Sequence, residues 1–224
     1  MGRRTRVFAA VLTAIVLTMG ILTGCGGGKP TEKDAKAYVQ AMMDLMCTGD
    51  YDHSVKLVDV EEGKETETRD KLIDDVLTSF GEEHEISDEV KAEFKDFMIK
   101  AFAKCKYTVG SATKTADGEY DVTVTIEPLK VFDGVSAEFQ EAFAAVVTER
   151  YEEISTMSDE EINDLIILTA IDILNQKLET PTYAEPENVV VHYGLIDEKE
   201  KVYGCSESDG EKIGEKLFSL EGLE

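Results

Sequence analysis

The sequence predicts an α+β fold in which helices pack on an antiparallel sheet made of two hairpins. Two observations support this prediction. Apolar residues recur every three to four positions over 31–104 and again over 133–174, which is the period of amphipathic helices. After each helical part the period changes to two, near 106–126 and 189–205, as expected for strands with one buried face.

A helix is predicted over 31–50, directly after Pro30. Apolar residues lie on one side of it and Lys and Asp residues on the other. Gly49 ends it, because glycine readily adopts the left-handed backbone found just beyond helix C-termini. The same period predicts three further helical segments: a single turn at 51–58, a helix at 65–80, and one at 87–104 with Ser87 as N-cap.

The first hairpin is predicted from strict alternation. In the segment 120–126, Tyr, Val and Ile alternate with Asp and Thr, and 116–119 has the composition of a turn. Pro128 closes the second strand, since proline cannot donate to a strand ladder. A second hairpin is predicted over 189–205 with its turn at 197–200, and a closing helix over 210–220.

Two helices are predicted between the hairpins. One begins near Asp133, and Ser158 with Glu161 forms the capping box of the next. The apolar residues of 162–174 point in every direction around that second helix. We therefore expect it to be enclosed by other elements as the core helix. Its charged residues bracket too short an apolar run for a membrane span.

The chain opens with a secretory signal pattern. Three arginines within 3–6 precede a mostly apolar stretch over 7–22, which small residues and a cysteine end before it could span a bilayer. Leu22, Thr23, Gly24 and Cys25 resemble the lipobox of bacterial lipoproteins at all four positions. The resemblance implies cleavage between Gly24 and Cys25 and a diacylglycerol on the Cys25 thiol.

Three parts of the chain follow from this resemblance: 1–24 as a lipoprotein signal peptide, 25–30 as the lipidated cysteine with a Gly-rich tether, and 31–224 as a single α+β domain. Two acyl chains are enough to hold a protein at a membrane. The expected location is the extracytoplasmic face of the cell membrane. The tether is short, at no more than about 3.5 Å per residue, so the folded domain is expected close to the lipid.

The charge of the domain excludes electrostatic binding of nucleic acid. The chain has 23 basic and 47 acidic residues, and removal of 1–24 moves the formal charge from −24 to −27. Phosphate backbones are repelled by such a surface. Bacterial leaflets are anionic as well, so the lipid must hold the domain against a repulsion that is screened within about 8 Å.

Cysteine usage argues against a disulfide framework. Besides Cys25 the mature chain has Cys47, Cys105 and Cys205, an odd number that cannot be fully paired within one molecule. A single bridge among the three stays open. On the helical interpretation of 87–104, Cys105 continues the apolar face and behaves as a small buried hydrophobe. No Cys or His spacing suits zinc, and we expect no metal site and no cofactor.

Candidate ligand residues lie on the predicted strands. Tyr107, Tyr120 and Tyr193 alternate with polar residues there, and His192 is beside the last of them. Together they could line a concave pocket on the sheet. The alternative interpretation is that these aromatic residues simply belong to the core. The segment Asp52–Ser54 contains triad residue types but no triad geometry follows from neighbours in sequence, and no catalytic residue is assigned.

The signal peptide, the lipobox, the order of elements and the strand Tyr120–Pro128 resemble a family of uncharacterised small Gram-positive lipoproteins. The resemblance implies an α+β domain related to the nuclear-transport-factor-2-like or cystatin-like fold, and no activity. We expect a non-catalytic binding or accessory module for a small molecule, peptide or protein. The alternative is an extracytoplasmic hydrolase, which would need two facing carboxylates about 5 to 9 Å apart in an open cleft.

Overall fold

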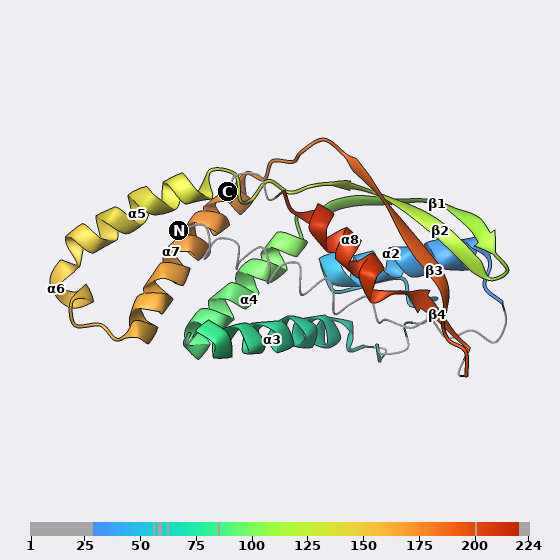
Figure 1. Cartoon of the computed structure of the whole chain (residues 1–224), viewed down its shortest axis with the longest axis horizontal. Helices are drawn as coiled ribbons and strands as arrows, with labels where there is room; N and C mark the ends of the chain where they lie inside the picture. Colours follow the sequence, from blue (N-terminus) through green and yellow to red (C-terminus); the bar gives the residue numbers. More distant parts are fainter. Residues whose placement is uncertain are drawn as a thin grey trace.

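The computed structural model describes residues 29–55, 57, 60–61, 63–84, 86–199 and 201–219 (Figure 1). Within them the predicted α+β class is confirmed. The elements are α2 (Glu32–Thr48), α3 (Glu65–His84), α4 (Asp88–Phe102), β1 (Lys106–Ala116), β2 (Glu119–Glu127), α5 (Val135–Glu149), α6 (Tyr151–Ile154), α7 (Asp159–Glu179), β3 (Glu187–Asp197), β4 (Val202–Cys205) and α8 (Glu207–Leu217). The predicted signal peptide, the cleavage site at Gly24 and the lipidated Cys25 lie outside the described residues.

The two predicted hairpins join into one antiparallel sheet of order β1-β2-β3-β4. Strands β2 and β3 connect them, with Val122 opposite Val191. The edge strand β1 follows β2 with two irregularities in register, one between Val109 and Ala112 and one between Lys114 and Ala116. Such bulges bend and twist a strand locally.

One face of the sheet is covered by helices and the other is not. Every second residue of β2 is buried, from Tyr120 to Ile126, while the Thr and Asp residues between them are partly exposed. Helix α2 runs along the buried face and α8 packs on the same face against β2 and β3 (Figure 1). The alternation in sequence therefore reports a sheet with one apolar and one polar face.

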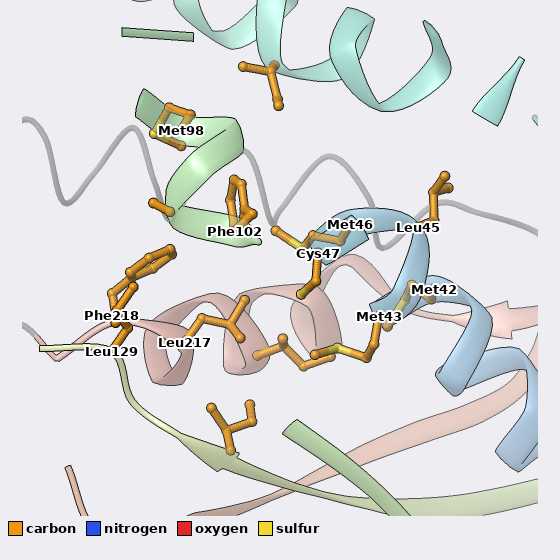
Figure 2. Packing of buried hydrophobic residues seen from close by; sticks show 14 of the residues in the cluster. Met42, Met43, Leu45, Met46, Cys47, Met98, Phe102, Leu129, Leu217 and Phe218 are labelled. Carbon is orange, nitrogen blue, oxygen red and sulfur yellow. The ribbon is translucent and has the colours of Figure 1, made fainter. Parts of the chain in front are cut away.

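The core lies between this face and helices α2, α4 and α8. Figure 2 shows sulfur-containing and aliphatic residues of α2 meeting Phe102 of α4 and Leu217 of α8. Helix α2 is buried along most of its length, and its buried residues are Ala35, Tyr38, Val39, Ala41, Met42, Met43, Leu45, Met46 and Cys47. Methionine suits this position because its flexible side chain fills irregular gaps.

Both ends of α2 are capped, and the C-terminal cap at Gly49 is the one that the sequence predicts. The Thr31 hydroxyl accepts from the Asp34 N–H at 3.3 Å, and the Asp34 carboxylate accepts from the Thr31 N–H at 2.8 Å. Gly49 ends the helix with φ 77°, and its N–H donates to the Leu45 carbonyl at 2.9 Å. A Cβ at Gly49 would lie 2.6 Å from Nη1 of the buried Arg69, so glycine is required by packing as well as by backbone conformation.

Helices α5, α6 and α7 form an arm that extends from the rest of the molecule, opposite the tips of the strands (Figure 1). The arm packs on the body through contacts between α7 and α4. The expectation that all of 162–174 is enclosed is wrong for its first half. Ile162, Leu165, Ile166 and Leu168 are only half-buried, whereas Ala170, Ile171, Ile173 and Leu174 are buried. Ile167 is buried as well, and Asp172 in the second half is exposed, so α7 is buried along one side rather than enclosed all round.

Two other predictions of local structure need correction. The described part of 51–58 is a turn rather than a helix, with the Val55 N–H donating to the Asp52 carbonyl and the Ser54 N–H to the Asp52 carboxylate. The Asp52 side chain competes with helical hydrogen bonding, as Asp does in turns. Helix α4 ends at Phe102, so Cys105 follows it and is half-buried rather than part of the helix face. None of the described helices is long and apolar enough to cross a membrane.

Candidate functional site

The predicted tether enters the fold at the turn between β1 and β2. The Lys29 ammonium pairs with the Asp117 carboxylate, and the Tyr120 hydroxyl donates to the Pro30 carbonyl at 3.1 Å. Helix α2 then begins at once, since Thr31 is its N-cap. We call Lys29, Pro30, Asp117, Gly118 and Tyr120 the tether base.

The sequence of the turn explains why the chain can dock there. Gly118 has φ 89°, a conformation that few other residues adopt. A Cβ at Gly118 would lie 3.6 Å from Cδ of Pro30 and 3.3 Å from Cε1 of Tyr203. The hydrogen bond and charge of Lys29, with help from Lys114, lower the pKa of Asp117, and the same contact raises the pKa of Lys29. The pair is thus ionised at neutral pH.

Two of the predicted ligand residues lie together beside the tether base. Tyr120 and Tyr193 are opposite each other on β2 and β3, and both point to the covered face. The Tyr193 ring lies 5.0 Å from the Tyr38 ring of α2 and 6.4 Å from the Tyr203 ring. Burial is the main reason that the pKa of Tyr193 is raised. Helix α2 therefore packs directly on this group of tyrosines.

Tyr107 shares that face but lies at the opposite end of the strands, where it pairs with Ile126. Its hydroxyl donates to the Asp44 carboxylate of α2, which also accepts from the Gln40 amide at 2.8 Å. Burial and the Asp44 hydrogen bond raise the pKa of Tyr107, so it stays a neutral donor.

His192 is on the other face of the sheet from the tyrosines. Its Nδ1 lies 3.0 Å from the Asp121 carboxylate, and both side chains are exposed. The structure thus brings Tyr120 and Tyr193 together and separates Tyr107 and His192 from them. That these four residues bind a ligand stays a prediction.

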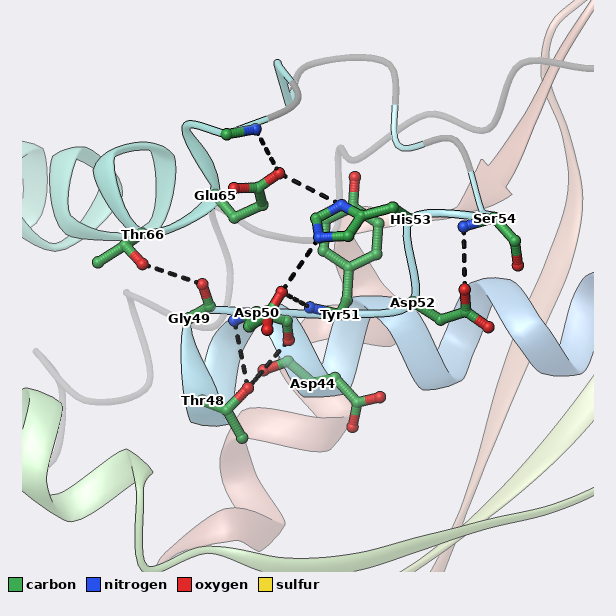
Figure 3. Close-up of polar contacts among 11 residues, drawn as sticks. Asp44, Thr48, Gly49, Asp50, Tyr51, Asp52, His53, Ser54, Glu65 and Thr66 are labelled. Carbon is green, nitrogen blue, oxygen red and sulfur yellow. Dashed lines mark hydrogen bonds and ion pairs between the residues drawn. The ribbon is translucent and has the colours of Figure 1, made fainter.

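A polar cluster around His53 was not predicted as a unit. Figure 3 shows His53 between two carboxylates, with Nε2 3.3 Å from Asp50 and Nδ1 3.3 Å from Glu65. The Ser54 N–H is bonded to Asp52, and no contact links Ser54 to the imidazole among the described residues, so this cluster has no nucleophile of a catalytic triad.

Buried carboxylates bear on the hydrolase alternative. Among the described residues, Glu65 and Asp209 are the buried acidic side chains. Glu65 accepts from the Gly63 N–H at 2.7 Å, whereas Asp209 accepts from Ser206 at 2.6 Å and from Lys212 at 2.7 Å. They have separate partners and do not form the facing pair that a carboxylate hydrolase requires. The described residues also include no group of three or more His, Cys, Asp or Glu placed to hold a metal ion.

The outermost part of the arm is acidic. Over 149–161 the chain has six acidic residues and one arginine, all exposed. Arg150 is paired with Glu153 at 2.6 Å, and Glu161 caps α7. The acidic residues are Glu149, Glu152, Glu153, Asp159, Glu160 and Glu161.

No protein-family model matches the chain, and no curated protein matches its sequence. A search of solved structures finds a similar fold in a crystal structure from Bacillus subtilis subsp. subtilis str. 168, described as a "putative lipoprotein (ycdA)". The TM-score is 0.56 at 12% sequence identity, over 83% of this chain and 56% of that one. The chain thus spans little more than half the length of this neighbour. At this identity the similarity concerns the fold alone.

Proposed function

We propose that this chain is a lipoprotein anchored to the extracytoplasmic face of the cell membrane through a diacylglycerol on Cys25, and that its domain is a non-catalytic binding or accessory module. The observation that supports this most is the tether base. Directly after the predicted lipidation site and its glycines, the chain is fixed to the β1–β2 turn by Lys29, Asp117 and Tyr120.

The tether base gives the domain an orientation. Four peptide links separate Cys25 from Lys29, which at about 3.5 Å each place the Lys29 backbone within roughly 14 Å of the lipidated residue, and the Lys29 side chain reaches the β1–β2 turn. The arm is at the other end of the molecule (Figure 1). In this arrangement the strand tips face the membrane and the arm points away from it.

Charge supports the same orientation. The end of the arm has five more acidic than basic residues over 149–161, and an anionic leaflet repels it. Repulsion is screened beyond about 8 Å at physiological salt, so the distal position costs little. A surface presented in this way favours a partner with positive charge over a nucleic acid or a second anionic surface.

The fold of the Bacillus subtilis neighbour supports a lipoprotein, because that protein is itself described as one. Its title names no ligand, and we transfer none. The hydrolase alternative is not favoured by any contact among the described residues, since Glu65 and Asp209 have separate partners.

Anchoring is tested by Cys25→Ala. We expect the variant to incorporate no labelled palmitate and to keep its leader, because both steps require the thiol. Cys205→Ala is the matched control, since Cys205 is buried and distant in sequence from the lipobox. Labelling of the Cys25 variant at the level of the control would overturn the anchoring proposal.

Orientation is tested on the lipidated protein in vesicles containing a lipid-borne quencher. A fluorescent amino acid is introduced at exposed Thr115, beside the tether base, or at exposed Glu152, on the arm. Quenching is expected at 115 and not at 152. Equal quenching at both sites, or quenching only at 152, would contradict the orientation while leaving anchoring intact.

A further inference from the structure

Two thiols far apart in sequence meet where α2 passes the start of β1. Cys47 is in the last turn of α2 and is buried, and Cys105 is the residue before β1 and is half-buried. Both thiols are free in the structure, and the Cys105 thiol donates to the Ala101 carbonyl at 3.7 Å. The neighbouring Cys47 thiol is the main cause of the raised pKa of Cys105. The contact lies at the side of the molecule where β1 is the edge strand.

A second contact fixes the alignment of the two elements. Asp44 is about one helical turn before Cys47, so these two side chains lie on one side of α2, and Tyr107 of β1 is two residues after Cys105. The Tyr107 hydroxyl donates to Asp44, which holds the last turns of α2 against the start of β1, where Cys47 and Cys105 lie. The backbone is held as well, because the Cys105 N–H donates to the Phe102 carbonyl at 2.9 Å and Lys106 pairs with Glu127.

The third cysteine of the domain has a different environment. Cys205 is the last residue of β4 and is 1% exposed. It lies near Asp209 of α8, and burial raises the pKa of its thiol. Cys205 pairs with Tyr193 of β3, whereas Cys47 is in α2 and Cys105 precedes β1.

We propose that Cys47 and Cys105 form a disulfide in the mature protein and that Cys205 stays reduced. The oxidant is a disulfide donor: outside the membrane a thiol–disulfide oxidoreductase, and in vitro oxidised glutathione. The Cys105 thiolate attacks one sulfur of the donor disulfide and releases the first donor thiol. Cys47 then attacks Sγ of Cys105 in the mixed disulfide and releases the second. The protein loses two protons and two electrons, which reduce the donor to two thiols.

The environment of the pair determines when this reaction occurs. The neighbouring Cys47 thiol and burial both raise the pKa of Cys105, so few thiolates exist in the folded domain at neutral pH. The bridge therefore forms mainly during folding, before α2 covers the thiols. Once formed, it closes a long loop and ties α2 to the junction of α4 and β1.

The pairing is tested on protein isolated from membranes in acid and then unfolded. Free thiols are alkylated with one reagent, and thiols released by reduction are alkylated with a second. Peptide mass spectrometry should find the first reagent on Cys205 and the second on Cys47 and Cys105. The first reagent on all three, or a bridge that includes Cys205, would overturn the proposal. Cys205→Ala is the matched control and should leave the labelling of the other two unchanged.

The same pairing is tested independently of anchoring with the purified domain refolded in a glutathione redox buffer. We expect the oxidised domain to melt higher than the reduced one by on the order of 10 °C, because a cross-link restricts the unfolded chain. A Cys47→Ala/Cys105→Ala variant should melt at one temperature with or without reductant. A wild-type melting temperature that reductant does not move would contradict the bridge, whatever the outcome of the Cys25 experiment.

Discussion

The sheet end and the arm both contain amphipathic helices, but the apolar faces of these helices are buried to different extents. Nine of the 17 residues of α2 are buried, whereas α5, with 15 residues, buries Val135 alone. Phe139 and Phe143 of α5 stack on each other at 5.4 Å and remain partly exposed. An apolar stripe in a sequence therefore identifies the face that packs, and the number of neighbouring elements decides how deeply it is buried.

The difference has a simple origin. Helix α2 has the sheet on one side and contacts α3 and α4 on others, while α5 packs mainly on α7 and the short α6. A residue with neighbours on one side keeps part of its surface in water, and hydrophobic stabilisation scales with the apolar area removed from water. We therefore expect the sheet end to contribute most of the folding free energy and the arm to tolerate more change.

The largest effect is expected from a charge placed at either of two positions along α7. Ile173 of α7 is 7% exposed and Ile166 is half-buried. Ile173→Asp should cost about 4 kcal/mol or more of unfolding free energy, because a lone buried carboxylate has no partner, and Ile166→Asp about 1–2 kcal/mol. Urea unfolding of both variants measures this. Equal losses would mean that the first half of α7 is as much a part of the core as the second half.

A smaller effect on the free energy of unfolding, dependent on pH, is expected from the capping boxes of α8 and α7. Asp209 caps α8 under the sheet and Glu161 caps α7 on the arm. Burial raises the pKa of Asp209, but the bonds from Lys212 and Ser206 outweigh it, so the pKa is lowered overall. A lowered pKa in the folded state gives stability that is present above the unfolded value near 3.9 and lost as pH falls through the folded value.

Asp209→Asn should therefore destabilise the domain by about 1–3 kcal/mol at pH 7, and the difference from wild type should shrink below about pH 4. Glu161→Gln should cost less, because its carboxylate is exposed and solvated. Chemical unfolding at pH 7 and pH 3 gives both values. If the Glu161 variant were the less stable of the two, the comparison between sheet end and arm would be reversed.

The smallest effect is expected at the tether base. Tyr120→Phe removes one hydrogen bond to Pro30 and keeps the ring that packs in the core. The cost should be about 0.5–1.5 kcal/mol, with no change in secondary structure by circular dichroism. In the vesicle experiment the quenching at residue 115 should become less complete. Unchanged quenching would show that Lys29 and Asp117 hold the tether base without this bond.

The fold class and nearly all helices and strands could be predicted because they depend on period and caps. Ser87 and Ser158 cap the helices they were expected to cap, and Gly49 ends α2 as expected. The exception at 51–58 arose because an Asp side chain bonded the backbone two residues on, which periodicity does not report.

The candidate site was less accessible to sequence reasoning. Lys29 with Asp117, Asp44 with Tyr107, and His53 with Glu65 are pairs of ordinary polar residues without characteristic spacing. Only the fold brings them together. Tyr193 and His192 were expected to share a pocket because they are neighbours in sequence. Neighbours on a strand point to opposite faces of the sheet, so Tyr193 lies on the covered face and His192 on the other.

The two bulges of β1 have a consequence for a protein held on a surface. Lipid anchoring confines molecules to a plane, where neighbours collide far more often than in free solution. An even, unpaired strand would offer each neighbour a row of free N–H and C=O groups for strand addition. The shifts between Val109 and Ala112 and between Lys114 and Ala116 break that row on β1, so under the proposed anchoring crowded copies of this domain would not join edge to edge along β1.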